Sequence, residues 1–383
     1  MKVTISVPGR FHAFYLAREM QLRGHLRALL TTYPRMEVAK YDIDPKLVKP
    51  KLAIEVVRRI WPRLPWNAGP VPDRRLLNFY DWEVSRSIPA DTELFVGWSG
   101  ASLAAIRAAK ARGMTTLLVR GSTHALHQRD ILLEEAAIWG TPTPAFDDAL
   151  IEKQLIEYDE TDFIYNQTEY VRRTFEDRGI DPARIAVVPT GVNPDWFYPI
   201  EKEDDVFRVI FCGGLSVRKG VPYLLQAFSD LDLPNSELWL IGPQTGDTET
   251  ILKMIDNDKI KVKGVYREWD LYKAYSQGSV FCLPSIEEGL AMVQAQAMAC
   301  GLPLICTEAA GGQAFVRDGQ EGYIVPMRSA EAITEKFAFC YENPAAAREM
   351  GKQARERVTG NFTWSHYGDR MEAAYRSLLD RSL

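Results

Sequence analysis

The stretch RVIFCGGLSVRKGVPYLLQAF, residues 208–228, combines a strand pattern, a glycine-containing turn and a helix pattern. Four of its first five residues, 209–212, are β-branched, aromatic or apolar, which is typical of a buried strand. From about residue 221 to 228 the apolar residues recur at helical spacing. Strands that alternate with helices in this way form parallel sheets, so the stretch predicts an α/β fold.

The same alternation extends along the chain on both sides of this stretch. Two series of strands and helices meet near residues 190–205, where proline, glycine and acidic residues are frequent, as in linkers. A length of 383 residues also favours two domains over one. The sequence therefore predicts two Rossmann-like domains in tandem. We expect their strands at residues 3–7, 93–96, 115–119, 163–166, 185–188, 208–212, 237–241, 260–262, 279–283 and 304–306.

Composition and charge argue against several classes of protein. The chain has 46 Lys and Arg against 51 Asp and Glu, and this balance is unlike that of a generally basic nucleic-acid binder. No apolar run approaches the ~20 residues that a membrane-spanning helix needs, and the apolar stretch at the N-terminus is short for a secretory signal. The five cysteines have no C-x-x-C spacing, which predicts reduced, buried thiols in a cytoplasmic protein.

Positive charge is concentrated near the start of the chain. Residues 1–90 hold 16 Lys and Arg against 8 Asp and Glu, a net charge of +8, so the remainder carries −13. The basic residues are dense in the segment 40–75, which has an amphipathic stretch near 52–60 and contains Trp61 and Trp66. One hypothesis is peripheral contact with an anionic acceptor or with an anionic membrane, at its inner face. The alternative is a solvated insertion whose tryptophans belong to the core.

Ligands of open α/β sheets bind at the carboxyl ends of the strands, so the residues that follow each strand are the candidates for chemistry. After the strand at the start of the quoted stretch, Gly213 and Gly214 precede Arg218 and Lys219. Two glycines followed by a guanidinium and an ammonium suit a diphosphate clamp. The loop is not a P-loop, because Gly220 stands where that motif requires Ser or Thr. The alternative is a solvated basic loop.

Three other strand ends carry candidate residues. Gly9 follows the first strand, where a glycine lets a backbone approach a phosphate or sugar, or simply makes a tight turn. His124 and His127 follow another strand, and two histidines at a strand end favour a site. Glu288 precedes a helix that carries Gln296 two turns further on. A carboxylate there can bind polyol hydroxyls or cap the helix.

Several motifs of other enzyme classes are missing from the sequence. It contains no H-E-x-x-H, G-x-S-x-G or G-x-G-x-x-G pattern, and the last absence argues against a dinucleotide oxidoreductase. Asp-x-Asp pairs can hold a divalent cation, but none here follows a buried strand, so we interpret them as turns. These pairs are Asp42 and Asp44, Asp230 and Asp232, and Asp256 and Asp258.

Taken together, these residues resemble the retaining glycosyltransferases of the GT-B fold, family 4 (glycosyl transferases group 1). The stretch EGLAMVQAQAMACG, residues 288–301, is similar to the family's E-G-F-G…E-A-M-A-x-G signature. VPTGVN at 188–193 and GGLSVRKG at 213–220 resemble its linker and phosphate loop, and FTW at 362–364 resembles the start of its returning C-terminal helix. The resemblance implies two domains that face each other across a deep cleft. Residues 1–195 would bind the acceptor, 196–365 the nucleotide-sugar donor, and 366–383 would form the helix that packs back on the first domain.

The resemblance also implies roles for individual residues. Arg218 and Lys219 would hold the donor diphosphate, and Glu288 would hold hydroxyls of the donor sugar. His124 is similar to a first-domain histidine that contacts the donor sugar, which completes the expected catalytic set. No metal or cofactor is implied, since the nucleotide sugar is a substrate. The other expected donor-binding residues are Gly9, Gly213, Gly214, Gly264, Val265, Gly289, Leu290, Ala291, Met292 and Gln296.

The chain departs from the family's pattern at several positions. Gln296 replaces the second Glu of the signature and would bind ribose hydroxyls without charge assistance, which costs about 1 kcal/mol. Gly214 replaces the usual arginine of the phosphate loop, and Arg218 would supply that guanidinium. In the linker, Thr190 and Asn193 stand where the family has Asn and Asp. Gln313 and Ala314 stand where the family has an acidic residue after the two glycines.

The implied reaction is metal-independent transfer of a sugar to an acceptor hydroxyl with retention of anomeric configuration, in the synthesis of a polysaccharide, glycolipid or other glycoconjugate. The positive loop would stabilise the leaving nucleoside diphosphate in place of a cation. Two alternatives stay open. One is a non-catalytic GT-B protein that binds a nucleotide sugar or a partner subunit, which Gln296 favours. The other is a sugar-nucleotide epimerase.

Overall fold

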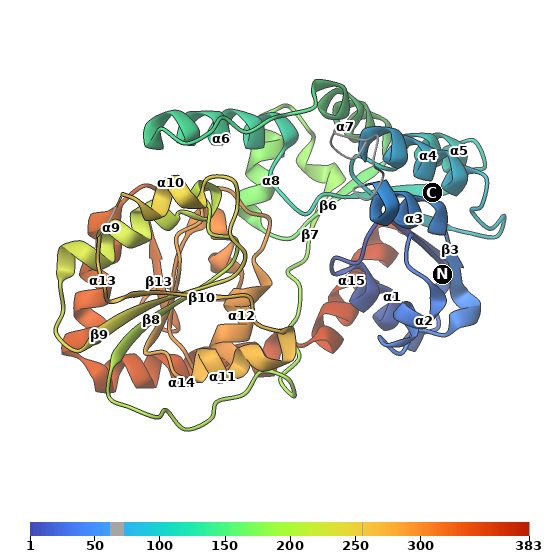
Figure 1. The fold of residues 1–383 in the computed structure, drawn as a ribbon. Coiled ribbons are helices and arrows are strands. Elements are labelled where there is room, and N and C mark those ends of the chain that lie inside the picture. Colours follow the sequence, from blue (N-terminus) through green and yellow to red (C-terminus); the bar gives the residue numbers. More distant parts are fainter. Residues whose placement is uncertain (62–72, 255, 383) are drawn as a thin grey trace.

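The computed structural model describes residues 1–61, 73–254 and 256–382 as two α/β domains side by side (Figure 1). The first sheet has the order β3-β2-β1-β4-β5-β6-β7 and the second the order β10-β9-β8-β11-β12-β13, and the paired strands in both are parallel. The expected pair of Rossmann-like domains is therefore confirmed. The strands of the first sheet are β1 (Val3–Val7), β2 (Leu26–Thr31), β3 (Val48–Pro50), β4 (Leu94–Trp98), β5 (Thr115–Val119), β6 (Phe163–Asn166) and β7 (Ile185–Val187). Those of the second are β8 (Phe207–Cys212), β9 (Ser236–Ile241), β10 (Ile260–Gly264), β11 (Val280–Leu283), β12 (Leu304–Thr307) and β13 (Gly322–Val325).

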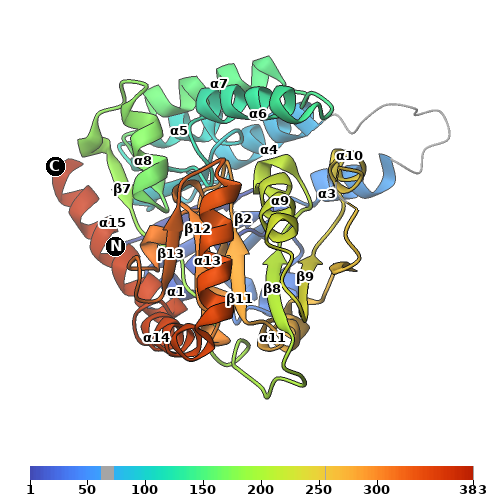
Figure 2. The ribbon, with the colours of Figure 1, turned by 90° about the vertical axis from the view of Figure 1, so that its left-hand side faces the viewer.

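Helices cover both sheets. In the first domain they are α1 (Ala13–Leu22), α2 (Arg35–Ala39), α3 (Leu52–Ile60), α4 (Asp73–Ser85), α5 (Leu103–Lys110), α6 (Ala125–Trp139), α7 (Asp148–Glu160) and α8 (Glu169–Glu176). In the second they are α9 (Val221–Leu231), α10 (Thr248–Leu252), α11 (Leu271–Ser276), α12 (Met292–Ala299), α13 (Ala330–Glu342) and α14 (Pro344–Asn361). Figure 2 shows α9 and α13 together on the outer side of the second sheet. All five cysteines are buried and unpaired, as expected.

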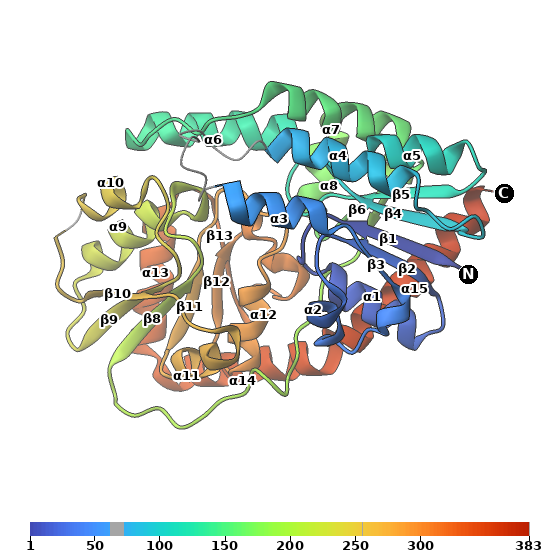
Figure 3. The same cartoon turned by 45° about the vertical axis from the view of Figure 1, so that its right-hand side comes forward.

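The last helix, α15 (Trp364–Ser382), leaves the second domain and returns to the first, as the resemblance implied (Figure 3). Its apolar face completes the core beneath β1, where Tyr367 and Tyr375 are fully buried. The Trp364 ring stacks on Tyr15 of α1 with 4.0 Å between centroids. The expected limits at residues 195 and 365 stay predictions; the first sheet ends at Val187 and α15 begins at Trp364.

Helix α6 extends from the first domain over the second (Figure 1). Its Glu135 side chain is fully buried there and accepts hydrogen bonds from Tyr223 Oη at 3.0 Å and Arg328 Nε at 2.5 Å. Trp139, one turn further along α6, packs edge-on against the Tyr223 ring with 5.0 Å between centroids. These contacts join the domains at a point separate from α15. None of the described helices is long and apolar enough to cross a membrane.

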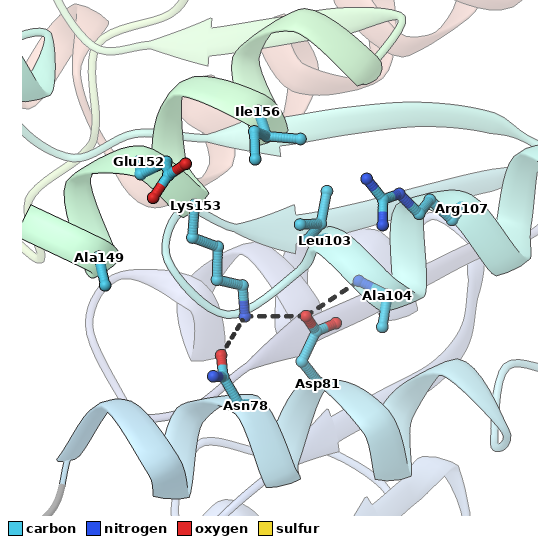
Figure 4. Close-up of a pocket in the computed structure, with 9 residues that line it drawn as sticks. All are labelled: Asn78, Asp81, Leu103, Ala104, Arg107, Ala149, Glu152, Lys153 and Ile156. Carbon is cyan, nitrogen blue, oxygen red and sulfur yellow. Dashed lines mark hydrogen bonds and ion pairs between the residues drawn. The ribbon is translucent and has the colours of Figure 1, made fainter.

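A cavity of about 540 Å³ lies between α4, α5 and α7 of the first domain (Figure 4). At its base Asp81 pairs with Lys153 Nζ at 2.9 Å and accepts 2.9 Å hydrogen bonds from the backbone N–H groups of Ala104 and Ala105. Both charged side chains are largely buried. The carboxylate therefore satisfies the otherwise unpaired N-terminus of α5 and joins three helices.

We expect Asp81→Ala to lower the free energy of unfolding by about 3–5 kcal/mol, because it leaves the buried Lys153 ammonium without a carboxylate and the α5 N-terminus without an acceptor. Urea denaturation followed by circular dichroism measures this change. The control is Glu160→Gln, which breaks a half-exposed ion pair with Arg107 on the same domain and should cost less than about 1 kcal/mol. Equal losses in the two variants would contradict the assignment.

Candidate functional site

The carboxyl ends of β5 and β11 bring the two domains into direct backbone contact. A Cβ added to Gly289 would lie 2.2 Å from the Gly121 carbonyl oxygen, so only glycine fits there. Thr168 Oγ1 of the first domain also donates a hydrogen bond to the Gly289 carbonyl at 3.1 Å. The signature glycine thus allows the loop after β11 to approach the first domain.

Glu287, beside that glycine, joins the domains through its carboxylate. The side chain is completely buried and accepts hydrogen bonds from the Ser122 hydroxyl, from Thr123 N at 3.0 Å and Oγ1 at 2.8 Å, and from Gln128 Nε2 at 3.0 Å. Burial raises the pKa of Glu287, but Arg218 and the first-domain donors outweigh it, so the pKa lies below its usual value. The sequence analysis gave this residue no role.

The predicted clamp residues gather at the ends of β8 and β11. Lys219 Nζ forms an ion pair with Glu288 Oε2, and Arg218 Nη1 lies 3.4 Å from the same oxygen. Arg218 Nη1 also donates to the Glu287 carbonyl at 3.0 Å. Gly220 has φ +70° and lies so close to Pro284 that a Cβ would meet its carbonyl at 1.9 Å. The close approach of the two loops explains how these distant residues meet.

The other expected donor-binding residues lie on loops at the same edge of the second sheet or opposite it. Gly213 and Gly214 follow β8, and Gly264 and Val265 lie at the end of β10 with the Val265 side chain exposed. Gln296 on α12 is buried and accepts a long hydrogen bond, 3.5 Å, from Tyr275 Oη. The remaining residues are Gly9 after β1 and Gly289, Leu290, Ala291 and Met292 at the entry to α12. Their binding roles stay predictions.

A cavity of about 300 Å³ opens between these loops and the carboxyl edge of the first sheet. His12, which follows β1, lines it and is 94% buried (6% exposed). Its Nδ1 lies 3.2 Å from Gln167 Nε2, whereas Nε2 has no hydrogen-bond partner among the described residues. The lining also includes Phe11, Trp98, Arg120, Leu290 and Met292.

His124 does not line this cavity, contrary to the expectation that it contacts the donor sugar. Its Nδ1 accepts a 3.3 Å hydrogen bond from Leu126 N and so caps α6. The ring packs between Tyr158 and Phe175, each at 5.1 Å between centroids. Capping turns the side chain into the first-domain core, and His12 is instead the histidine in the cleft. His12 stands in the glycine-containing loop after the first strand, which was the only sequence signal for it.

The buried histidines predict a defined pH dependence of stability. Burial lowers the pKa of both His12 and His124 to about 4. The unfolded chain takes up these protons near pH 6.5 while the folded chain does not, so the free energy of unfolding falls as pH drops from about 6.5 to about 4. His12→Gln should remove up to about 3 kcal/mol of that loss.

Urea denaturation at several pH values between 7 and 4.5 measures this slope. The matched variant is His124→Gln, which should remove a similar share. An unchanged slope in His12→Gln would contradict the neutral, buried state of that ring.

Among residues 1–61, 73–254 and 256–382, no three His, Cys, Asp or Glu side chains gather as metal ligands would. Two of the Asp-x-Asp pairs instead supply ion pairs at the surface. Asp232 lies 2.7 Å from Lys259 Nζ, and Asp42 lies 3.5 Å from Arg18 Nε.

The fold and the arrangement of its strand ends are those of the GT-B class. Sucrose-phosphate synthase from Thermosynechococcus elongatus superposes over 100% of both chains with a TM-score of 0.73 at 19% identity. Anabaena Alr3699/HepE in complex with UDP superposes over 98% of this chain and 100% of that chain, with a TM-score of 0.72 at 13% identity. These similarities confirm the expected GT-B fold.

Sequence comparison points to the same class of protein. Residues 193–357, in the second domain, match the family model of glycosyl transferases group 1, the family that the sequence resembles. Alpha-maltose-1-phosphate synthase of Mycolicibacterium smegmatis is 27% identical over 54% of this chain and 60% of its own length. D-inositol 3-phosphate glycosyltransferase 1 of Catenulispora acidiphila is 25% identical over 53% of this chain and 54% of its own. The chain thus spans about half the length of the curated relatives it matches.

Proposed function

We propose that the protein is a retaining hexosyltransferase that moves a sugar from a nucleotide sugar to an acceptor hydroxyl. The observation that carries this proposal is the gathering of Arg218, Lys219 and Glu288 at the carboxyl ends of β8 and β11, opposite the first domain. Two cations at that point suit a diphosphate, and a carboxylate beside them suits sugar hydroxyls. The UDP complex of the Anabaena structural neighbour makes UDP-sugars the first donors to test.

In the proposed reaction, each charged group has a separate task. Arg218 and Lys219 stabilise the negative charge that develops on the departing nucleoside diphosphate, which is the step that a divalent cation assists in other transferases. Glu288 orients the donor sugar by accepting hydrogen bonds from its hydroxyls. The low pKa of His12 keeps its ring neutral near pH 7, so it contributes a hydrogen bond rather than a charge. The acceptor hydroxyl attacks from the first-domain side, on the face that the diphosphate leaves.

Thermal denaturation with UDP-, GDP-, ADP-, CMP- and TDP-linked sugars tests donor binding, since a ligand that binds only the folded state raises its apparent stability. Transfer is then assayed with the donor that gives a shift. The replacement of the second signature Glu by Gln296 favours one alternative, a non-catalytic protein that binds a nucleotide sugar or a partner subunit. Binding without turnover of donor or acceptor would support it, and a changed sugar from donor alone would support an epimerase.

We also propose a cytoplasmic protein that contacts an anionic membrane at its inner face through the segment 40–75. Helix α3 supports this idea, because Leu52, Val56 and Ile60 expose between 43% and 50% of their surface on one side of it. Trp66 lies outside the described residues, so the alternative of core tryptophans is not tested for it.

Flotation with phosphatidylglycerol vesicles and with phosphatidylcholine vesicles tests the membrane contact. The wild type should float with the anionic vesicles, and Val56→Glu should reduce this recovery. Equal recovery with both kinds of vesicle would exclude an anionic membrane as the partner.

A further inference from the structure

The 300 Å³ cavity between the domains has a positive character that the proposed donor clamp does not explain. Arg120 lines it from the end of β5, and none of the described residues that line it is an aspartate or a glutamate. Arg218 and Lys219, which we assign to the donor diphosphate, are not among the lining residues. The cavity therefore has a cation of its own.

Arg120 is oriented but not neutralised by its surroundings. Its Nε donates to the Thr123 carbonyl at 3.0 Å and its Nη2 to Gln128 Oε1 at 2.8 Å. Both acceptors are uncharged, and Nη1 has no hydrogen-bond partner among the described residues. The nearest buried acid in this network is Glu287, which binds the far end of Gln128 and pairs with Arg218. A guanidinium held in this way is preorganised to bind an anion through its free N–H groups.

Helix α1 adds to the positive character of the same cavity. It is ten residues long and begins directly after Phe11 and His12, which both line the cavity. Its first turn has no acidic residue and no side-chain cap. The free N–H groups of such a helix end favour a negative charge.

We propose that Arg120 binds an anionic group, a phosphate or carboxylate, that the acceptor carries close to the hydroxyl that receives the sugar. This inference rests on the proposed glycosyl transfer and adds the acceptor's chemical class. The rings of Trp98 and Phe11 in the same cavity suit the apolar face of a sugar ring. The proposed acceptor thus carries a negative charge and is not a neutral glycan end.

Inorganic phosphate is the probe, titrated into protein that is first saturated with UDP so that the donor clamp is filled. We expect phosphate to raise the melting temperature of the wild type, and its apparent Kd to weaken about tenfold or more in Arg120→Met. Arg120→Lys, which keeps the charge but loses the fork, should lie between them. Arg129→Met removes a partly exposed cation of α6, the helix that follows Arg120, and should respond like the wild type. Glucose 6-phosphate should also stabilise more than glucose.

The outcomes separate this inference from the proposed function. Equal phosphate responses in wild type and Arg120→Met, or no response of the UDP-saturated wild type, would overturn the anionic subsite. Weaker UDP binding in Arg120→Met would assign the arginine to the donor instead, and would also overturn it. If UDP and the other nucleoside diphosphates do not bind the wild type, the proposed function fails, and phosphate titrated into the free protein still reports on Arg120.

Discussion

Lys219→Met should lower kcat/KM for sugar transfer by about 10²–10³-fold, which is the usual cost of removing one preorganised group that stabilises transition-state charge. Lys219 is 91% buried (9% exposed) and its ammonium lies against Glu288 beside Arg218, so little solvent screens it. Methionine retains the aliphatic stem and much of the packing. Arg218 remains close enough to neutralise Glu288, so we expect the variant to fold.

Steady-state kinetics and UDP titration of the same samples measure this loss. The control is Lys273→Met, which removes an exposed lysine paired with Asp270 on the surface of the same domain. This control should keep the wild-type kcat/KM. A Lys219→Met enzyme with wild-type kcat/KM would show that the clamp does not act on the donor.

Glu287→Ala should have the second largest effect, through the approach of the two domains. The substitution removes the acceptor of four first-domain hydrogen bonds and leaves the half-buried Arg218 guanidinium with one carboxylate fewer. Breaking a buried, hydrogen-bonded charge of this kind costs about 3–5 kcal/mol. When the domains open, water can reach the first-domain hydrogen-bond donors that Glu287 had paired. We therefore expect the lost free energy to appear as weaker domain closure, which should lower kcat/KM at least about 10²-fold.

Small-angle scattering and kinetics test this prediction together, since an open form has a larger radius of gyration. Glu308→Gln is the matched control, because Glu308 also pairs across the domains, with Arg173, but both side chains are exposed. It should change the free energy of closure by less than about 1 kcal/mol. Equal effects of the two variants would contradict the special role of the buried carboxylate.

The lowered pKa of Glu287 gives this contact a pH dependence. A carboxyl with a folded-state pKa below its free value of 4.5 stabilises the closed form fully above pH 4.5. The contribution is lost as pH falls through the folded-state pKa. Glu287→Gln, which keeps the shape but not the charge, should abolish this part of the acid response.

Most central strands of both domains were predictable from sequence because they combine β-branched residues with a turn signal, but β2 (Leu26–Thr31), which lies inside the first sheet, was not among the expected strands. Strand β5 was predicted at residues 115–119, its observed limits. Strand β3 has three residues and ends at Pro50, and β13 begins with Gly322, so neither has a clear strand pattern. Both pair at the ends of longer strand arrays, where neighbouring strands supply the pairing that local sequence does not.

The candidate site was predictable only for residues that belong to a motif contiguous in the sequence. The phosphate loop and the signature indicated Arg218, Lys219 and Glu288, which the fold brings together. The contact of Glu287 depends on which first-domain loop faces it, and no local pattern contains that information. His124 and His12 both follow strands, and only the helix cap at His124 decides which of the two rings lies in the cleft.

Thermal denaturation of wild type and Lys219→Met with the panel of nucleotide sugars tests the central claim most directly. The account predicts that sugars linked to one nucleoside diphosphate raise the melting temperature of the wild type, and that the Lys219→Met protein, folded without ligand, loses this shift. An absence of any shift in folded wild type, or an equal shift in the variant, would contradict a donor site at the ends of β8 and β11.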